Sequence, residues 1–496
     1  MARSRLAFLA ATLCLLAHAA FGKGYATTGL SEAQQCRLQR IRATQPDERL
    51  EFEGGVAEVW SEDDEQFQCA GVAAIRNVLR PNALFLPEFT NAPRLVFIEQ
   101  GRGLLGITYP GCAETYHSDR SSGSSGGRGR RWQEEGQQGE QGSGDQHQKV
   151  HRIRQGDIIA IPEGTVHWCH NDGDEELIAV SVIDLNNEGN QLDQRLRSFF
   201  LAGSFSGQGR QQGQQSRRQS GRYNFQNIFQ AFDTGLIAES FNVPAEIAQR
   251  LQQQNDRGFM INVRERMRVI VPEEDDEEYD EYEEQQEGMR RQSRPGRPGR
   301  PGRHWPLNSQ NGLEETFCTM KIKQNVDFRR EADFFSRQAG RVNIVNMHKL
   351  PILRYMDMSA ERGRLLPNAL YSPHWSMTDH RIVYVTQGDA QVQIVGQNGQ
   401  NVFDEQVSEG SMFVIPQFFT SAARAGDSGF EWITFKTSSQ PMKSPLAGYT
   451  SVFRALPIQV ITNSFQMSPR DAQELKYNRE HQTFLLSPSR RNLPMS

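Results

Sequence analysis

The residues with the greatest chemical potential lie together in the stretch Gly156–Asn171, GDIIAIPEGTVHWCHN. This stretch contains an imidazole at His167, a thiol at Cys169 and a second imidazole at His170. Imidazole is the commonest metal ligand in proteins, and a thiol beside an imidazole is the pair from which nucleophilic cysteines are built. The stretch therefore raises two kinds of chemistry, metal binding and thiol catalysis.

Both kinds of chemistry need partners that the sequence must also supply. His167 and His170 are three residues apart, so on a strand their side chains point to opposite faces. Nothing near Cys169 offers a third group to orient an imidazole, and this favours a buried, inert cysteine. GRGLLG at Gly101–Gly106 approximates a dinucleotide-binding loop, but no helical pattern follows it, and the chain has no P-loop.

Two long stretches of the chain repeat each other. RPNALFLPEFTNAPRLVFIEQGRG (Arg80–Gly103) matches LPNALYSPHWSMTDHRIVYVTQGDA (Leu366–Ala390). GDIIAIPEGTVHW (Gly156–Trp168) matches GSMFVIPQFFTSA (Gly410–Ala422). The repeated runs are short, rich in Val, Ile and Phe, and interrupted by Gly, Pro and Asn, which is typical of antiparallel strands in a sandwich or barrel. The sequence therefore predicts a mainly β fold with two copies of one domain.

Helical patterns follow each set of predicted strands. In the first half they are QLDQRLRSFFLAG (191–203) and PAEIAQRLQQQ (244–254), and in the second half SPLAGYTSVFRAL (444–456) and SPRDAQELKYN (468–478). The last begins with Ser468, Pro469 and Asp471, a capping residue, a proline at the first helical position and an acid in the first turn. The apolar faces of such helices need a barrel or another subunit to cover them.

Several segments are not expected to belong to the folded domains. Residues 1–22 have a basic start, an apolar run and small residues after it, and they predict a secretory signal peptide that ends near Lys23. The apolar run is shorter than the roughly 20 residues of a membrane span. Residues 118–148, 204–222 and 273–310 are rich in Gly, Gln and Arg or strongly acidic, and predict disordered loops.

The Arg-Gly sequences within these loops have a second interpretation, binding of RNA. The chain as a whole is acidic, with a net charge of −5, and its RPGRPGRPGR run lies close to the acidic block EEDDEEYDEYEE. An acidic block competes with nucleic acid for the arginines, so we expect solvated linkers and no nucleic-acid partner.

Five cysteines remain once the signal peptide is removed: Cys36, Cys69, Cys112, Cys169 and Cys318. In an oxidising secretory compartment pairs are expected and one thiol is left over. Spacing alone does not fix the pairing, and no cysteine lies in a C-x-x-C zinc pattern.

These features together resemble the cupin superfamily, and within it the bicupin 11S globulins, or legumins, of seeds. The resemblance rests on the two repeated barrel motifs and on NGLEETFC at Asn311–Cys318, which is similar to the legumin junction between acidic and basic chains. It implies two tandem cupin jelly-roll barrels, each followed by a small helical arm. It also implies a seed storage protein, a nutrient reservoir of nitrogen and amino acids that proteolysis mobilises at germination. Storage proteins of this kind are often food allergens.

Metal-binding cupins use a His-x-His pair, a Glu a few residues later and a His from the second motif. Counting back from Gly101 and from Gly388, and adding the second motif, places these four positions as follows: Pro87, Phe89, Arg94 and His167 in the first barrel, and His374, Ser376, Arg381 and Ser421 in the second. One ligand of four survives in each barrel, while metal sites need three or more donors. We therefore expect no metal, no cofactor and no enzymatic activity. A metal-dependent cupin or a module that binds a small ligand is the alternative.

The resemblance also implies how the chain is processed and assembled. An asparaginyl endopeptidase cuts between Asn311 and Gly312, giving an acidic chain (23–311) and a basic chain (312–496). Disulfides Cys36–Cys69 and Cys112–Cys318 form, and Cys169 stays free. The proform is a homotrimer and the mature protein a hexamer, delivered through the secretory pathway to the protein storage vacuole. Asn-Gly is also a hairpin signal, so a simple turn is the competing interpretation.

Charge agrees with the predicted acidic and basic chains, and composition agrees with the predicted storage of nitrogen. Residues 312–496 carry 20 Lys and Arg against 17 Asp and Glu, and the whole chain carries 55 against 60, so the part before the cut has a net charge of −8. Only eight of the basic residues are lysines. Arginine and glutamine are rich in nitrogen, and loops that need not pack accept any composition, which suits a nitrogen store.

Overall fold

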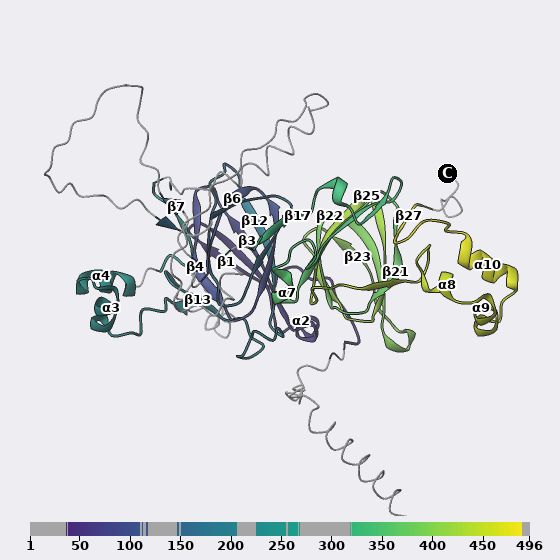
Figure 1. Ribbon diagram of the computed structural model, residues 1–496, viewed down its shortest axis with the longest axis horizontal. Coiled ribbons are helices and arrows are strands. Elements are labelled where there is room, and N and C mark those ends of the chain that lie inside the picture. Colours follow the sequence, from purple (N-terminus) through teal and green to yellow (C-terminus); the bar gives the residue numbers. More distant parts are fainter. Residues whose placement is uncertain are drawn as a thin grey trace, which may run out of the picture.

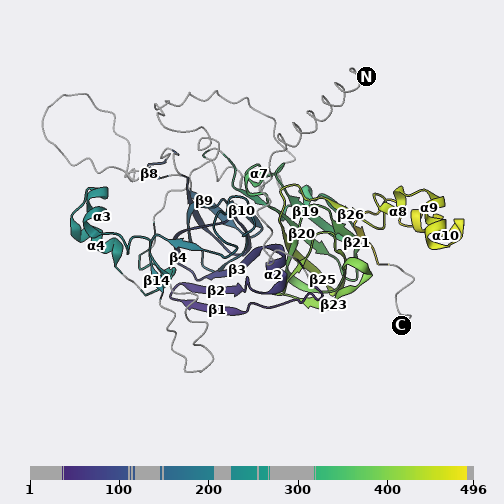
Figure 2. The ribbon, with the colours of Figure 1, turned by 90° about the horizontal axis from the view of Figure 1, so that it is seen from below.

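Two β-barrels lie side by side, each with a small group of helices at its far end (Figure 1, Figure 2). The computed structural model describes residues 36–109 without 37, 112, 116–117, 146–147, 150–205, 225–265 without 254 and 255, 267, 318 and 320–488. All paired strands are antiparallel, and the two barrels confirm the predicted mainly β class and the internal duplication.

The first barrel is built from two sheets, in the orders β1-β2-β3-β12-β5-β10-β17 and β13-β4-β11-β6-β9, with β16 paired to β4. Two short pairs, β7 with β8 and β14 with β15, lie outside them. The bounds are β1 Glu48–Phe52, β2 Gly55–Trp60, β3 Val72–Leu79, β4 Ala83–Thr90, β5 Arg94–Gln100, β6 Arg102–Thr108, β7 Tyr116–His117, β8 Gln146–His147, β9 Val150–Arg154, β10 Asp157–Ile161, β11 Val166–His170, β12 Leu177–Asp184, β13 Ser198–Phe200, β14 Ser204–Phe205, β15 Phe225–Gln226, β16 Met260–Asn262 and β17 Lys323–Asn325.

The second barrel is one continuous sheet in which the long strands β22 and β25 bend and pair with several neighbours. Its strands are β18 Phe334–Ser336, β19 Gly340–Val345, β20 Ser359–Leu365, β21 Leu370–Ser376, β22 Arg381–Val395, β23 Asn401–Ser408, β24 Met412–Ile415, β25 Thr420–Lys436, β26 Lys443–Pro445 and β27 Leu485–Leu486. Short helical turns between strands are α2 Glu65–Ala70, η3 Arg329–Glu331, α7 Leu353–Met356 and η4 Gln397–Gly399.

The repeated sequence motifs mark the same backbone turns in both barrels. Asn82 and Asn368 of the two P-N-A sequences both adopt a left-handed conformation, with φ of 62° and 60°. Asparagine tolerates this region better than most residues because its short side chain bonds locally. Gly101 and Gly388 also share a positive φ, 83° and 74°, and an added Cβ at either would collide with a carbonyl oxygen of a neighbouring strand. The repeat therefore conserves turn geometry within the chain as well as strand pattern.

The two barrels share one apolar core. Its buried residues come from both, and include Trp60, which is fully buried in the first barrel, and Tyr384 of the second. Their rings meet edge to face with centroids 6.0 Å apart. The Trp60 Nε1–H donates to the carbonyl of Thr44 at 3.1 Å, so the indole is satisfied where it is buried. Burial of aromatic side chains between the barrels fixes them as one body.

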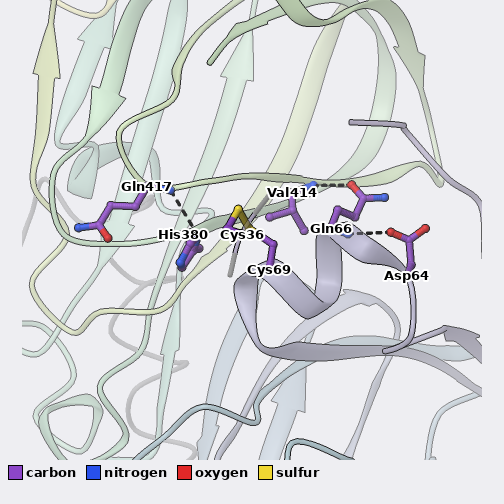
Figure 3. The surroundings of a disulfide bond; sticks show 7 residues. All are labelled: Cys36, Asp64, Gln66, Cys69, His380, Val414 and Gln417. Atoms are coloured by element: carbon purple, nitrogen blue, oxygen red, sulfur yellow. Dashed lines mark hydrogen bonds between the residues drawn. A yellow bond between two sulfur atoms is a disulfide. The ribbon is translucent and has the colours of Figure 1, made fainter. Parts of the chain in front are cut away.

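The N-terminal segment of the first barrel lies on the second barrel. The Ile41 N–H donates to Val402 O at 3.0 Å, and Thr44 forms a β-bridge with Met412. Helix α2 adds the Gln66 side chain, whose Oε1 accepts from the Val414 N–H at 3.1 Å (Figure 3). The disulfide Cys36–Cys69 ties the segment to the end of α2. Residues from the first half of the chain thus pack on the second barrel and stabilise it.

Residues that follow Asn311 in turn contribute a strand to the first barrel. Strand β17 pairs antiparallel with β10 of the first barrel, with Ile158 opposite Gln324. Val326 N then donates to Gly156 O at 2.8 Å. The expected boundary at 311 therefore does not coincide with the boundary between barrels, because the start of the 312–496 segment completes a sheet of the first barrel.

Two of the four predicted helical patterns form the expected helices. The first arm consists of α3 Thr234–Phe241 and α4 Ala245–Gln252, and the second of α8 Val452–Ala455, α9 Ile458–Phe465 and α10 Pro469–Tyr477. The Ser468 side chain caps α10, as expected, by accepting from Asp471 N. The prediction of a helix over 191–203 is wrong, because this segment is irregular and ends in strand β13. The pattern over 444–456 forms only α8, after strand β26.

The limits of two predicted loops also need correction. Ser204 and Phe205 belong to β14, which pairs with β15, so the prediction of a disordered loop over 204–222 is wrong for its first two residues. Gln146 and His147 form β8, inside the predicted 118–148 loop. The rest of both loops, the 273–310 segment and residues 1–22 lie outside the described residues. Within the described part of the chain, no helix has the length and apolar character needed to cross a membrane.

Candidate metal centres in the two barrels

In the first barrel the strand pleat places a different pair of side chains inside from the pair we predicted. Burial alternates along β4, and Glu88 and Thr90 point inward while Pro87 and Phe89 lie on the other face. Phe89 stacks there on Phe199, with ring centroids 4.9 Å apart. The placement of Pro87 and Phe89 at the metal positions is therefore wrong by one residue.

The error arose from the length of one turn. Three residues separate Thr90 from Arg94, whereas four separate Ser376 from Arg381 in the second barrel. Counting back from Gly101 with the longer spacing shifts the whole strand by one position. Aligning the two P-N-A turns instead would have matched Glu88 with His374, and would have identified the inward carboxylate from sequence.

Glu88, Arg94 and His167 come together inside the first barrel. Glu88 and His167 are opposite each other on β4 and β11, and Arg94 begins β5. Arg94 Nη1 donates to Glu88 Oε1 at 3.0 Å, and all three side chains are nearly inaccessible to solvent. His167 Nε2 lies 3.7 Å from Glu88 Oε1, beyond hydrogen-bonding distance. The guanidinium thus binds the carboxylate that would otherwise be free to hold a cation.

The electrostatics of this cluster keep the imidazole neutral. Burial and the nearby Arg94 charge lower the pKa of His167 to about 3. Its Nδ1 faces the carbonyl of Thr165 at 3.3 Å, so Nδ1 carries the hydrogen and Nε2 is an acceptor. Burial raises the pKa of Glu88, and Arg94 offsets part of that effect.

In the second barrel three of the four predicted positions, His374, Arg381 and Ser421, come together. Arg381 Nη1 donates to His374 Nε2 at 2.8 Å and to Ser421 Oγ at 3.0 Å. Its Nη2 donates to Phe419 O at 3.0 Å. Ser376 lies on the same buried face of β21, and its hydroxyl donates to Asp379 at 2.6 Å. Burial, and then the Arg381 charge, lower the pKa of His374 well below its ordinary value.

A second charged cluster, not expected from the sequence, lies beside Arg381. Glu361 on β20 accepts from Lys436 Nζ at 3.0 Å, from Lys443 Nζ at 2.6 Å and from the Tyr371 hydroxyl at 2.7 Å. Burial raises the pKa of Glu361, but the two lysines lower it by more, so its pKa lies well below the usual range. Burial lowers the pKa of Lys443 to about 8. No sequence motif predicts this cluster, because its members come from four different strands, β20, β21, β25 and β26.

These donor sets do not fit a transition metal. The first barrel offers one carboxylate and one imidazole, and the second offers one imidazole, while protein sites for zinc or iron use at least three protein ligands. Nowhere in the described ranges do three or more His, Cys, Asp or Glu side chains group so as to hold a metal ion. Arg94 lies within hydrogen-bonding distance of Glu88 in the first barrel, and Arg381 within hydrogen-bonding distance of His374 in the second. At about 4 Å and an effective dielectric of about 20, the repulsion between either arginine and another unit positive charge is worth roughly 4 kcal/mol.

The remaining predicted site residues concern cysteine chemistry and processing. The structure contains the disulfides Cys36–Cys69 and Cys112–Cys318, and Cys169 is free. Burial raises the pKa of the Cys169 thiol to about 12, which makes it a poor nucleophile. Asn311 and Gly312, the expected cut site, lie outside the described residues.

The interiors of the two barrels differ in size. The inner cavity of the second barrel, which Arg381 and His374 line, measures about 40 Å³. The first barrel has an inner cavity of about 60 Å³ at His167 and an adjoining one of about 390 Å³. The two cavities of the first barrel share Asn77, Phe85 and Arg94 in their walls.

The chain is similar to known proteins along nearly its whole length. The family model described as Cupin matches residues 41–206 and 327–473. The chain is 52% identical to the 11S globulin seed storage protein 2 of Sesamum indicum over 484 residues, which is 97% of this chain and 98% of that protein. Its fold is similar to the crystal structure of the coconut allergen cocosin (TM-score 0.74, 35% identity, 92% of this chain and 100% of that one). It is equally similar to the structure of an 11S globulin from Wrightia tinctoria, which reveals an auxin binding site in that protein (TM-score 0.74, 35% identity, 92% of this chain and 97% of that one).

Proposed function

Since the chain belongs to the cupin family and, within it, to the 11S seed storage globulins, we propose that both of its barrels are free of metal and without enzymatic activity. The protein is a seed storage protein, a reserve of nitrogen and amino acids mobilised by proteolysis at germination. The observation that carries the proposal is the arginine in each barrel, Arg94 and Arg381, bonded to the side chain at a former ligand position. The guanidinium group of each arginine occupies the place that a bound metal ion would take.

The metal content of the protein tests this proposal. Protein purified without chelators and analysed by elemental mass spectrometry should contain less than about 0.1 copper, zinc, iron or manganese per chain, because neither barrel supplies three donors. Close to one metal per chain would contradict the proposal. In that case the variant His374→Ala and its first-barrel counterpart His167→Ala would show which barrel holds the ion, because the metal would be lost from the barrel whose imidazole is removed.

We further propose that the chain assembles head to tail into a homotrimer. The two helical arms lie at opposite ends of the molecule (Figure 1, Figure 2). The first arm exposes Leu236, Phe241 and Ile247 by 45 to 54%. The second arm exposes Phe465 and Leu475 by similar fractions, 53% and 52%. Apolar faces at opposite ends of one chain favour a heterologous contact, which closes into a ring when the rotation allows it.

Cleavage between Asn311 and Gly312 by an asparaginyl endopeptidase is the next step that we propose, followed by pairing of trimers into hexamers in the storage vacuole. The sequence pattern of residues 1–22 supports entry into the secretory pathway. The disulfide Cys112–Cys318 joins the two parts across the cut, and strand β17 holds the start of the basic part in the first barrel. A cut protein therefore keeps its fold, and the acidic segment before Asn311 gains a free end.

The variant Asn311→Ala tests this order of events. After treatment with the endopeptidase, wild-type protein should sediment as a hexamer, and the variant should remain an uncut trimer, because the acidic segment stays tethered at both ends. Asn308→Ala, which changes a nearby asparagine, serves as the matched control and should behave like the wild type. An uncut Asn311→Ala protein that forms hexamers would contradict the proposed role of the cut.

A further inference from the structure

The larger cavity of the first barrel, of about 390 Å³, has the size of a small-molecule site. It lies between the β1-β2-β3 edge of one sheet and strands β4 and β13 of the other, as the lining residues Ala57, Asn77, Phe85 and Phe199 show. The interior of the second barrel at the matching arginine is about tenfold smaller. The duplication of the fold has therefore left one barrel with room for a ligand.

Eight of the 21 residues that line this cavity are aromatic. Phe52 contacts Phe205 and Phe259, with ring centroids 5.1 Å and 4.3 Å away. Phe225 stacks on Phe200 at 4.0 Å. The rings come from β1, β13, β14, β15 and the residue before β16, so distant parts of the chain converge to build an apolar, flat-sided space. Such walls favour a planar apolar molecule.

The polar end of the cavity carries atoms that the protein leaves without a partner. Within the described part of the chain, the buried Arg94 Nε and Asn77 Oδ1 have no hydrogen-bond partner, although Arg94 Nη1 binds Glu88. His167 Nε2, an acceptor in the adjoining inner cavity, is equally without one among the described residues. Arg94 and His167 are 4% and 3% exposed, so bulk water does not reach these atoms. A buried polar atom left unpaired costs about 1 to 3 kcal/mol, which a ligand would recover.

The unpaired atoms specify the head group of that ligand. In the wall of the larger cavity they comprise one donor, Arg94 Nε, and one acceptor, Asn77 Oδ1, while His167 Nε2 belongs to the adjoining inner cavity. A hydroxyl group both donates and accepts, so it matches this set, whereas a carboxylate only accepts. The charges of Arg94 and Glu88 already balance, and Glu88 would repel an anion.

We propose that this cavity binds a small, uncharged aromatic compound with a hydroxyl group, a phenol by chemical class, whose oxygen accepts from Arg94 Nε and whose hydrogen is donated to Asn77 Oδ1. Storage of nitrogen does not require this property, so it adds a binding function to the reserve protein. It also stands independently of the proposed assembly and processing.

Three probes that share one ring system test the head group. 2-Naphthol, naphthalene and 2-naphthoate are titrated into the full-length, assembled protein at pH 7 by isothermal titration calorimetry. 2-Naphthol should bind at one site per chain, at least tenfold more tightly than either of the others. Affinities of 2-naphthoate equal to or higher than those of 2-naphthol would overturn the proposal, as would absence of saturable 2-naphthol binding up to about 1 mM.

Two variants test the place of the site. Ala57→Leu fills the cavity wall and should abolish 2-naphthol binding, while Ala423→Leu, its control in the wall of the second barrel, should leave the affinity unchanged. Asn77→Leu removes the acceptor and should lower the affinity for 2-naphthol about tenfold, to that for naphthalene. Unchanged binding by folded Ala57→Leu protein would overturn the proposal. If Asn77→Leu does not fold, two measurements still test the proposal: the comparison of the three probes on wild-type protein, and 2-naphthol binding by Ala57→Leu.

Discussion

Replacing Glu361 with leucine should destabilise the second barrel by about 3 to 5 kcal/mol, because it leaves two buried lysines without a counter-charge. Lys436 and Lys443 have side chains only 1% and 6% exposed, and both contact the Glu361 carboxylate. The measurement is the free energy of opening of β20 and β25, followed by native-state hydrogen exchange, since the two barrels need not unfold together.

Two further variants test whether the effect comes from leaving the buried lysines unpaired, and not from the loss of a carboxylate as such. Glu405→Leu removes a carboxylate of the exposed pair with Arg40, where the side chains are 42% and 67% exposed, and should change stability by less than about 1 kcal/mol. The triple variant Glu361→Leu, Lys436→Met, Lys443→Met should recover most of the lost stability, because a buried ion cluster can be replaced by apolar side chains. A Glu361→Leu protein as stable as the wild type would show that water reaches these lysines.

The fold could be predicted from the sequence wherever pattern and local chemistry agreed. The two repeated stretches predict two copies of one barrel. Within them Asn82 and Asn368, and likewise Gly101 and Gly388, share the positive φ that their turns need. The Ser468 cap correctly fixed the start of α10. Local signals were sufficient there because the interactions that stabilise these turns and caps lie within a few residues.

The failures came where tertiary pairing decided the outcome. Residues 191–203 have a helical pattern, yet Phe199 and Phe200 pair with β4 and complete a sheet. Likewise, no local signal shows that β17 joins the first barrel or that Gln66 reaches Val414 of the second. These contacts join residues more than 100 positions apart, and single-sequence periodicity contains no information about them.

The candidate site was predictable in composition but not in register. Counting placed Arg94 and Arg381 correctly, but it left one donor in the first barrel where the structure has two. A turn shorter by one residue puts Glu88 in the place given to Pro87, and Thr90 in the place given to Phe89. A shift of one residue on a strand exchanges its faces, so a small counting error reverses which side chains meet. The Glu361 cluster and the cavity at Asn77 depend on side chains of several strands, which no motif spans.

Replacing Asp184 with asparagine should remove a large dependence of stability on pH. Asp184 ends β12 at the junction of the barrels, where burial raises its pKa to about 7, and the carboxylate of Asp357 adds to the shift. Unfolded, its pKa returns to about 3.8. The folded protein therefore retains a proton that the unfolded chain has lost, and stability falls by up to about 1.4 kcal/mol per pH unit between those two values.

The direction of this effect makes the contribution of Asp184 to stability greatest in acid. Its contribution is fully present below the unfolded pKa and is lost as the pH rises through about 7, so Asp184→Asn should gain up to about 4 kcal/mol at pH 8 and nothing at pH 3.5. Urea unfolding at several pH values measures it, with Asp193→Asn, an exposed aspartate paired with Arg197, as the control. Equal slopes for wild type and Asp184→Asn would place the titration elsewhere. A carboxyl that resists ionisation at the junction of the barrels therefore favours the folded state in the acidic range.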